Sequence, residues 1–454
     1  MILNSHHKKF LESSRDHILM LSVHGVHEWK VVPGLHDTGG QNVFVNQFSS
    51  ALEKKGFKVT IVNRGGYKHP STGEPQIGLH YKGKHQRILY LEDGLDDFVR
   101  KEDMGDQIPD LVNSLSNFIS TDGPPVDLII SHYWDGALLG CALREELGIS
   151  AQHVWVPHSL GVVKKRNINP QAWENLRIFD RIAFEEKILG QIDFLAATSS
   201  IIRESTQSDY DYQGKFLWLP PCVDRERYYP RQVDKSDPIW SLLSGVTNLP
   251  EEEIQGRKII TEISRTDKTK QKDILIRSFA QVLKNHPDSL LILSIDDSHT
   301  VLAEELRSLI KTCGVQHSTA VVGSIWEALP MVYAISDIYC TPSIMEGFGM
   351  SVQEAAATKV PIISSTLVPF VTEYLDGQNS RSLTSESGAV IQAGQGALIV
   401  SPGDINGFAF ALELLLSDNE LRAEMGEFAY QTVVTKFTWE RIVQNFIEGL
   451  KVAN

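Results

Sequence analysis

Residues 17–63 read HILMLSVHGVHEWKVVPGLHDTGGQNVFVNQFSSALEKKGFKVTIVN. This stretch predicts a strand, a helix and a second strand in succession. Residues 17–24 form a short apolar run that predicts a buried strand. Residues 43–55 repeat apolar side chains at helical spacing, and Gly56 is a typical residue to end that helix. Residues 57–63 predict the next strand. A strand–helix–strand unit predicts a parallel sheet covered by helices.

The same alternation continues along the chain and breaks once. Apolar runs predict four further strands before the break and four after it: 127–133, 152–158, 194–200 and 216–221, then 257–264, 290–296, 337–343 and 360–366. Between the two sets, residues 224–256 are rich in proline and charge and predict a connector with one short helix. We therefore expect an α/β protein of two Rossmann-like, doubly wound parallel-sheet domains with a boundary near residue 222. Residues 437–450 predict a last, amphipathic helix.

The bulk composition narrows the class of protein. The 454 residues carry a net charge of −14, with 42% hydrophobic and 22% charged residues, as is typical of a globular protein with a full core. Such an acidic chain is a poor candidate for binding nucleic acid or an anionic membrane. Its four cysteines form no CxxC pair, which argues against a zinc or redox motif and favours a reducing compartment. Because the sequence has neither an apolar signal core nor a membrane-spanning apolar run, we expect a cytoplasmic protein.

A glycine pair stands between the first strand and the first helix. Gly39 and Gly40 lie in residues 37–41, where a backbone without side chains can approach a ligand closely. The free N–H groups at the start of the following helix favour an anion. A tight turn followed by a helix cap would give the same pattern.

Polar residues also follow two later strands of the first half. His132 and Asp135 lie at the end of one predicted strand, and His158 ends another. Ligands of such sheets bind outside the carboxyl ends of the strands, so these residues are placed to contact one. Each histidine could equally be a structural residue with satisfied hydrogen bonds.

Local clusters of cations stand out in this acidic chain. Lys164, Arg177 and Arg181 follow the second histidine and could bind a phosphate, or form a solvated helix face with plain surface pairs. Arg265 and Lys270 follow the first strand of the second half. Their spacing suits a loop that places two cations on one diphosphate, although surface charge would look the same.

The stretch EGFGMSVQE, residues 346–354, follows a predicted strand and opens a helix. Gly347 and Gly349 allow close approach of the backbone, and the helix start offers N–H donors. Glu346 and Glu354 can lie on one helix face about two turns apart. One could touch a sugar ring while the other reaches a ribose hydroxyl.

In this order, the features resemble the family-four retaining glycosyltransferases. The resemblance extends over nearly the whole chain and rests on the glycine pair, the second histidine, the two cations of the second half and the two glutamates of EGFGMSVQE. It implies the GT-B fold, in which two Rossmann-like domains face each other across a cleft. HDTGGQNVFV, SHYWDG and PHSLG resemble a narrower branch of sucrose-phosphate synthases, sucrose synthases and mannosylfructose-phosphate synthases.

The resemblance implies a division of labour along the chain. An acceptor-binding domain would cover residues 1–222, a nucleotide-sugar-binding domain residues 223–436, and a C-terminal helix over 437–454 would pack back on the first domain. The implied partners are a nucleotide sugar and a sugar phosphate, with no nucleic acid. No metal is obligatory in the family, and Mg²⁺ would at most stimulate the reaction.

The resemblance also implies roles for single residues. Arg265 and Lys270 would neutralise the departing nucleoside diphosphate, while the leaving phosphate takes the acceptor proton in a same-face attack. Glu354 would bind the ribose. The implied catalytic residues are His158, Arg265, Lys270 and Glu346. Those implied for donor binding are Gly39, Gly40, Gly347, Phe348, Gly349, Met350 and Glu354. Those implied for acceptor binding are Gln41, His132, Asp135, Lys164, Arg177 and Arg181.

Three stretches depart from the family pattern. Sucrose-phosphate synthases carry a basic residue before the aromatic of a segment that helps to hold the acceptor phosphate, whereas Asp97 precedes Phe98 here. The family usually carries paired glycines and a proline after the strand predicted at 360–366, whereas residues 366–370 here are TLVPF and lack the glycine pair. Residues 377–394 form an insertion without an assigned role. The first departure argues against fructose-6-phosphate as the acceptor.

We expect a retaining hexosyltransferase that moves glucose from UDP-glucose to fructose-6-phosphate. GDP-mannose as donor, or free fructose as acceptor, is the alternative within the same fold. A two-carboxylate glycoside hydrolase would need neither the paired cations nor the glycine-rich loops. A non-catalytic sugar-nucleotide sensor would be expected to lose Lys270 or Glu346, and both are present.

Overall fold

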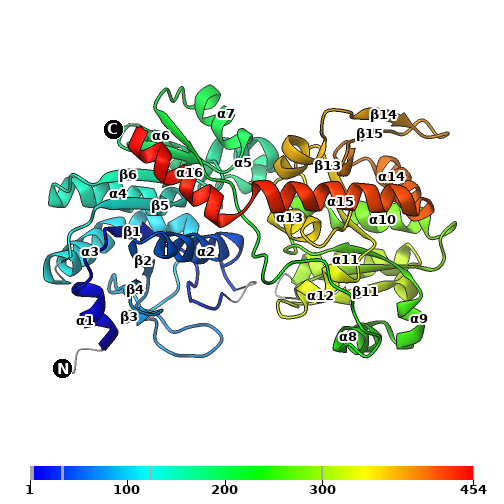
Figure 1. Cartoon of the computed structure of the whole chain (residues 1–454), viewed down its shortest axis with the longest axis horizontal. Coiled ribbons are helices and arrows are strands. Elements are labelled where there is room, and N and C mark those ends of the chain that lie inside the picture. The colour runs from blue at the N-terminus through cyan, green and yellow to red at the C-terminus, as the bar shows by residue number, and fades with distance from the viewer. Residues whose placement is uncertain (1–4, 32–34, 123, 298–299, 453–454) are drawn as a thin grey trace. The chain divides into compact units, whose positions relative to one another are not determined.

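The chain forms two compact units (Figure 1). The computed structural model describes residues 5–31, 35–122, 124–297 and 300–452. The N-terminal unit comprises Met1–Pro220 with Trp439–Asn454, and the C-terminal unit comprises Pro221–Thr438. The first four residues of the predicted acceptor domain and the last two of the predicted C-terminal helix lie outside the described residues.

The sheet of the N-terminal unit has eight strands. They are β1 (His17–Leu21), β2 (Lys58–Arg64), β3 (Gly78–Tyr81), β4 (Gln86–Leu91), β5 (Leu128–His132), β6 (Gln152–Val156), β7 (Phe194–Ala197) and β8 (Lys215–Trp218). Their order is β3-β4-β2-β1-β5-β6-β7-β8, with β3 antiparallel to β4 and the other pairs parallel. Every residue of the central strand β1 is buried, whereas the edge strand β3 alternates between exposed and half-buried positions.

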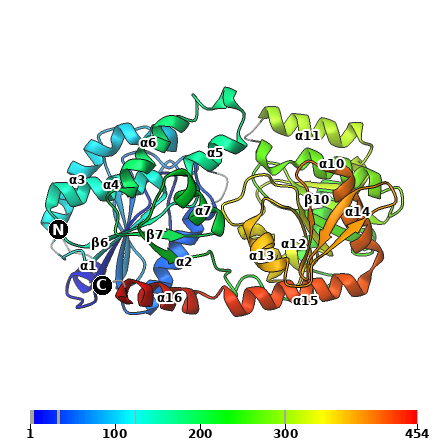
Figure 2. The ribbon, with the colours of Figure 1, turned by 90° about the horizontal axis from the view of Figure 1, so that it is seen from above.

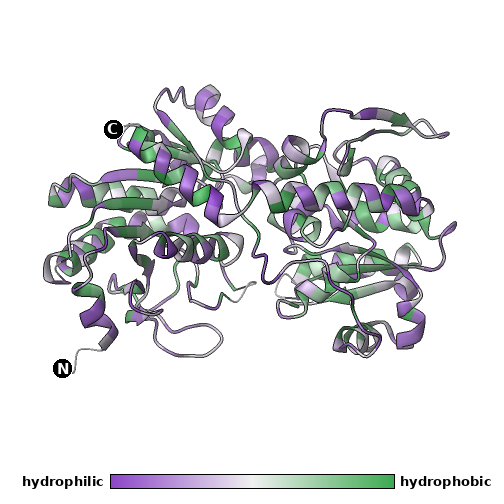
Figure 3. Cartoon of the chain, in the orientation of Figure 1, coloured by the Kyte–Doolittle hydropathy of each residue, from purple (hydrophilic) through white to green (hydrophobic). Residues whose placement is uncertain are grey.

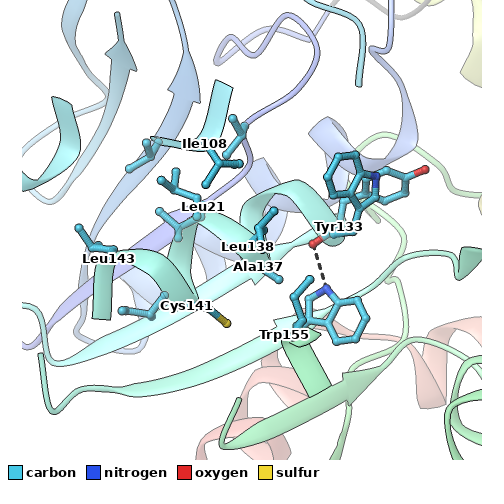
Figure 4. Close-up of a cluster of buried hydrophobic side chains, with 14 of the residues drawn as sticks. Leu21, Ile108, Tyr133, Ala137, Leu138, Cys141, Leu143 and Trp155 are labelled. Atoms are coloured by element: carbon cyan, nitrogen blue, oxygen red, sulfur yellow. Dashed lines mark hydrogen bonds between the residues drawn. The ribbon is translucent and has the colours of Figure 1, made fainter. Parts of the chain in front are cut away.

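Helices cover both faces of this sheet (Figure 2). They are α1 (Ser5–Leu11), α2 (Gly40–Lys54), η1 (Lys101–Gln107), α3 (Ile108–Asp122), α4 (Tyr133–Leu147), α5 (Gly161–Asn167), η2 (Pro170–Ala172), α6 (Ile178–Leu189), α7 (Ser200–Asp209) and α16 (Trp439–Val452). The core between α4 and the sheet includes Leu21, Leu138 and Trp155, whose Nε1 donates to the carbonyl of Tyr133 at 2.9 Å (Figure 4). The last helix, α16, packs against α2 and β8.

The sheet of the C-terminal unit also has eight strands. They are β9 (Lys258–Glu262), β10 (Ser289–Ser294), β11 (Thr319–Val322), β12 (Ile338–Thr341), β13 (Ile362–Ser365), β14 (Arg381–Thr384), β15 (Val390–Ala393) and β16 (Ala397–Val400). Their order is β11-β10-β9-β12-β13-β16-β15-β14. The first six strands in this order, from β11 to β16, pair in parallel, and β15 and β14 continue the sheet antiparallel. Two mainly parallel sheets confirm the predicted α/β class.

Helices on both faces complete the C-terminal unit. They are α8 (Pro238–Thr247), α9 (Glu251–Gln255), η3 (Lys268–Lys270), α10 (Lys272–Val282), α11 (Thr300–Thr312), η4 (Gln316–Ser318), α12 (Leu329–Ala334), α13 (Met350–Ala356), η5 (Val371–Leu375), α14 (Ile405–Ser417) and α15 (Asn419–Lys436). The strands consist mostly of hydrophobic residues, whereas helices such as α15 contain both hydrophobic and hydrophilic residues along their length (Figure 3).

Two segments differ from the sequence expectation. The predicted connector contains two helices, α8 and α9, rather than one, because Asp237 caps a run whose Ile239, Trp240 and Leu243 are buried in a small core. The insertion 377–394 is largely a hairpin of β14 and β15 at the sheet edge. Its strands are half exposed, so the hydrophobic pattern that would announce them is weak.

Candidate active site

In the N-terminal unit, three residues that follow neighbouring strands have a strained backbone conformation. Asp37 follows β1, Tyr133 follows β5 and His158 follows β6, with φ of 51°, 64° and 58°. A non-glycine residue in this left-handed region costs about 1–3 kcal/mol, so its surroundings must hold it there. Such strain is concentrated where proteins aim side chains at a ligand. The carboxyl ends of these strands therefore form the first candidate site.

The glycine pair lies where α2 begins. Gly39 has an extended φ of 178°, which any residue can adopt, and a side chain added there would meet no atom within 4 Å. Nothing in the described chain thus requires glycine here, whereas a ligand close to the backbone would. Gly40 starts the helix, whose first N–H groups have no partner within it. Gln41 Nε2 is buried without a hydrogen-bond partner among the described residues, so it is a further donor to a ligand.

The two predicted histidines contact each other. Nδ1 of His132 and Nε2 of His158 share a hydrogen bond of 2.9 Å, and their rings stack at 5.2 Å. Burial lowers the pKa of His158 to about 3, and burial together with His158 lowers the pKa of His132 well below its usual value. Both rings are therefore neutral near pH 7. The pair can hydrogen-bond a sugar hydroxyl but supplies no positive charge.

Asp135 is fully buried beside the loop after β1. Its carboxylate accepts a hydrogen bond from the backbone N–H of His24 at 3.0 Å and another from His24 Nδ1 at 2.9 Å. These bonds tie the start of α4 to that loop. Asp135 thus has a structural role independent of any contact with an acceptor.

A small pocket beside Tyr133 collects the predicted cations. Its volume, about 10 Å³, has room for one water. Arg177 is partly exposed there and pairs with Asp106 at 2.6 Å and with Asp180 at 2.9 Å. The lining residues are Lys101, Glu102, Tyr133, Trp134, Lys164, Leu176, Arg177, Asp180, Arg181 and Phe184.

The cationic side chains of this pocket differ in how closely carboxylates pair with them. Lys101 pairs with Asp37, whose carboxylate also accepts the backbone N–H of Lys101 at 2.9 Å. Lys164 lies 3.9 Å from Glu102, which is a weak pairing. Burial, with help from the charges of Arg181 and Lys101, lowers the pKa of Lys164. An anion in the pocket would relieve this repulsion, and Lys164 is the cation best placed to gain from it.

Arg181 is buried, and most of its donors are engaged. It donates to Glu185 at 2.8 Å, to the hydroxyl of Tyr133 at 2.5 Å and to the carbonyl of Ser159 at 2.6 Å. This is a buried pair, not the surface pair that the sequence also allowed. Because Ser159 follows His158, Arg181 fixes the loop that carries this histidine.

In the C-terminal unit, the loops after β9 and β12 meet. Nζ of Lys270 lies 2.5 Å from Oε1 of Glu346, so the structure brings two predicted catalytic residues together. The N–H of Ile344 donates to the carbonyl of Thr269 at 2.8 Å and ties the loops to each other. The contact follows from the parallel pairing of β9 with β12. Arg265, from the same loop as Lys270, is exposed.

The two glutamates of EGFGMSVQE do not share a helix face, so that expectation is wrong. Helix α13 begins at Met350, and Glu346 therefore precedes it while Glu354 lies within it. The chain turns at Gly349, which has φ of 111°. A side chain there would come within 2.7 Å of Val368, so the fold itself requires this glycine.

The residues around this turn contribute differently. The Phe348 ring is buried and packs on Phe370 at 5.5 Å and on Phe437 at 5.6 Å, so any contact with a donor would come from its backbone. Gly347 and Met350 are half-buried on either side of this segment.

Glu354 lies in an aromatic environment near Tyr228 and Tyr333. Burial raises its pKa to about 8, against the opposing effect of Arg227. The guanidinium of Arg227 lies 4.1 Å from the ring centre of Trp326. Glu354 is half-buried, and a carboxyl with a strongly shifted pKa is a candidate ligand contact.

Comparison with known protein families identifies the family to which the chain belongs. Residues 38–227 match the family described as Glycosyltransferase Family 4, and residues 248–432 match Glycosyl transferases group 1. The chain is a family-four glycosyltransferase. Like that family, it is a retaining hexosyltransferase.

Relatives of this glycosyltransferase align over most of its length. It is 25% identical to Mannosylfructose-phosphate synthase of Agrobacterium fabrum, over 95% of this chain and 90% of that protein. It is 26% identical to D-inositol 3-phosphate glycosyltransferase of Corynebacterium jeikeium, over 90% of both. Among solved structures, Sucrose-phosphate synthase of Thermosynechococcus elongatus matches 97% of this chain and all of its own, with a TM-score of 0.78 and 24% identity. The fold is therefore that of the GT-B glycosyltransferases.

Two absences concern the described part of the glycosyltransferase. No group of three or more His, Cys, Asp or Glu side chains there could hold a metal ion. No helix there is long and apolar enough to cross a membrane.

Sequence reasoning missed Lys101 and the surroundings of Glu354. Lys101 comes three residues after Phe98, in the segment that departs from the family pattern, and this proximity was the available signal. Asp97 is exposed and is not among the residues that line the pocket. Tyr228 and Tyr333 lie far from Glu354 in the sequence, and no motif connects them.

Proposed function

We propose that this glycosyltransferase moves glucose from UDP-glucose to fructose-6-phosphate with retention of configuration. The choice of acceptor rests on the pocket that Lys164, Lys101 and Arg181 line together. The positive charge of Lys164 has only a weak carboxylate partner there. The names of both relatives, a mannosylfructose-phosphate synthase and a D-inositol 3-phosphate glycosyltransferase, support a phosphorylated acceptor. The N-terminal unit would bind the acceptor and the C-terminal unit the nucleotide sugar.

In the proposed reaction, the bond between the anomeric carbon and the diphosphate oxygen breaks. The hydroxyl oxygen on the anomeric carbon of fructose-6-phosphate bonds to the glucose carbon on the same face, and its proton passes to the leaving diphosphate. The products are sucrose phosphate and UDP. Negative charge grows on the diphosphate, so preorganised cations supply most of the stabilisation. Arg265 and Lys270 would provide them, with Glu346 orienting Lys270 and contacting the hexose.

On the acceptor side, neutral histidines suit neutral hydroxyls. His158 and His132 would hydrogen-bond the sugars, with Gln41 as a further donor. Lys164 would bind the phosphate, and Arg181 would hold the loop after β6 in place. A pocket of about 10 Å³ accommodates no complete phosphate, so the Lys164 side chain must move aside as the acceptor enters.

The acceptor site is tested with Lys164→Ala. We expect a raised KM for fructose-6-phosphate and unchanged donor binding, because Lys164 touches only the phosphate. In the native enzyme, kcat/KM for fructose-6-phosphate should exceed that for fructose by at least about a hundredfold, since unpaired cations gain nothing from the neutral sugar. Lys165→Ala is the matched control, because this neighbour lies over Trp173 and Phe179 instead of lining the pocket. Equal kcat/KM for the two acceptors would exclude a phosphate site.

A second donor has specific support. The name of the Agrobacterium relative points to mannose, so GDP-mannose is the alternative to UDP-glucose. A panel of nucleotide sugars with fructose-6-phosphate and fructose, scored for nucleotide release, separates these choices. Release from GDP-mannose alone would replace UDP-glucose as the donor. Nucleotide binding without any release would favour a sensor.

A further inference from the structure

A buried ion pair lies directly beneath the loop that carries Arg265. Glu262 ends β9 and Lys272 begins α10, and the loop runs from one to the other. Glu262 is 0% exposed and Lys272 is 2% exposed, and Nζ of Lys272 donates to Oε2 of Glu262. The pair thus joins the two ends of the loop that contains Arg265 and Lys270.

Lys272 also binds the loop itself. Its Nζ lies 3.2 Å from the carbonyl oxygen of Ser264 and 3.0 Å from the Ser264 hydroxyl. The hydroxyl of Ser294, on β10, accepts the N–H of Ser264 at 3.0 Å and lies 3.2 Å from the same Nζ. Both polar backbone groups of the residue before Arg265 are therefore fixed.

The loop is tethered on its other sides as well. The N–H of Asp296 donates to the hydroxyl of Thr266 at 2.7 Å, which fixes the residue after Arg265. The hydroxyl of Tyr339 donates to the carbonyl of Ile263 at 3.1 Å. Arg265 is thus an exposed side chain between two anchored neighbours.

Stability alone does not account for this pair. Two apolar residues of similar volume often serve a core as well as a buried ion pair, or better, because burying charge is unfavourable. Oε1 of Glu262 is buried and has no hydrogen-bond partner among the described residues, which makes the arrangement less favourable still. What the charges add is a set of directional bonds to the backbone beside Arg265.

We propose that Glu262 and Lys272 are positioning residues, which hold the Ser264–Arg265–Thr266 loop so that Arg265 meets the departing diphosphate. The inference rests on the proposed function, because it takes Arg265 as a diphosphate contact. Neither residue touches the substrate. Their effect passes through the Ser264 backbone and reaches the diphosphate alone.

The test replaces the pair with apolar residues in Glu262→Leu/Lys272→Met. A single substitution would leave an unpaired buried charge and could unfold the unit, whereas the double variant should keep its thermal unfolding temperature. We expect its affinity for UDP to fall about tenfold and its kcat about 10–100-fold, because small misplacement of a catalytic group costs this much. Affinity for uridine and the acceptor KM should stay within about twofold, since neither depends on Arg265. Lys258→Met, which breaks an ion pair at the other end of β9, is the matched control.

A double-mutant cycle separates this inference from the proposed function. Arg265→Ala should weaken UDP binding and kcat in the native protein and add little in the pair variant, where the Arg265 side chain is already misplaced. Equal effects of Arg265→Ala in both backgrounds, or native kinetics in the folded pair variant, would overturn the positioning role while leaving the diphosphate site intact. No effect of Arg265→Ala in the native protein would overturn both. If GDP or ADP proves to be the nucleotide, it and its nucleoside replace UDP and uridine.

Discussion

Single cations of the C-terminal unit should control turnover. Arg265→Ala and Lys270→Ala are each expected to lower kcat by about 10²–10³, the usual loss for one preorganised charge. Lys268→Ala is the matched control, because this exposed lysine shares the η3 segment with Lys270. Steady-state kinetics measures kcat for each variant, and unfolding curves check that each variant is folded. Near-native turnover of both variants would mean that the diphosphate binds elsewhere.

Glu354 should give nucleotide binding a characteristic pH dependence. Burial raises its pKa to about 8, so the carboxyl is mostly protonated at pH 7 in the free enzyme. If the carboxylate accepts the ribose hydroxyls, binding favours the deprotonated form. Affinity should then be constant above pH 8 and fall by up to about tenfold for each unit below it. Calorimetry of UDP binding between pH 6 and 9 measures this slope, and Glu354→Gln should abolish it. A native enzyme with a flat profile would contradict the ribose role.

Residue-scale reasoning from the sequence located the candidates but not their partners. Arg181 and Glu185, four residues apart, fit an exposed helix pair as well as the buried pair that forms. The sequence contains no sign that Tyr133 and Ser159 complete that environment. Lys101 went unnoticed for the same reason, since only folding brings it beside Lys164. Patterns in the sequence place side chains at strand ends, whereas burial and neighbours decide which cations stay available.

At the scale of elements, the last helix supports the N-terminal unit. Phe446 of α16 is buried, and its ring meets Phe48 of α2 edge-on at 5.3 Å. Phe446→Ala should therefore lower the free energy of unfolding of this unit by about 3–5 kcal/mol. Val452→Ala, at an exposed position of the same helix, should change it by less than about 0.5 kcal/mol. Denaturant unfolding of both variants checks this. A Phe446→Ala protein as stable as the native one would show that α16 is dispensable.

Several buried central strands were predictable, and so was the edge strand β8, whose range Lys215–Trp218 overlaps the prediction at 216–221, whereas the solvated edge strands β3 and β14 were not. Strands such as β1, β5 and β9 are buried apolar runs, and the predictions at 17–24, 127–133 and 257–264 overlap them. The edge strands β3 and β14 face solvent and lack such a run. Strand β4 is buried throughout, yet it begins with Gln86 and Arg87, and this polar start hides it. The signal thus weakens wherever a strand is solvated or buries a charge.

At the scale of the whole molecule, the two units should respond to acid in opposite directions. Burial lowers the pKa of His17, His153 and His158 to about 3 and that of His27 to about 4, and all four belong to the N-terminal unit. In the unfolded chain these side chains bind a proton near pH 6.5. Their contribution to stability is therefore complete above pH 6.5 and is lost as the pH falls towards about 3, or about 4 for His27, by up to about 1.4 kcal/mol per unit for each histidine.

In the C-terminal unit, Glu354 acts in the other sense. Because folding raises its pKa, its contribution to stability is complete below its ordinary value of 4.5 and is lost as the pH rises to about 8. Acidification from pH 7 to 5 should thus weaken the N-terminal unit first. Hydrogen exchange followed by mass spectrometry should show β1, β5 and β6 losing protection before β9, β10 and β12. His153→Gln should reduce the proton uptake on unfolding by about one. If the strands of the C-terminal unit open first, the buried histidines do not govern the acid response.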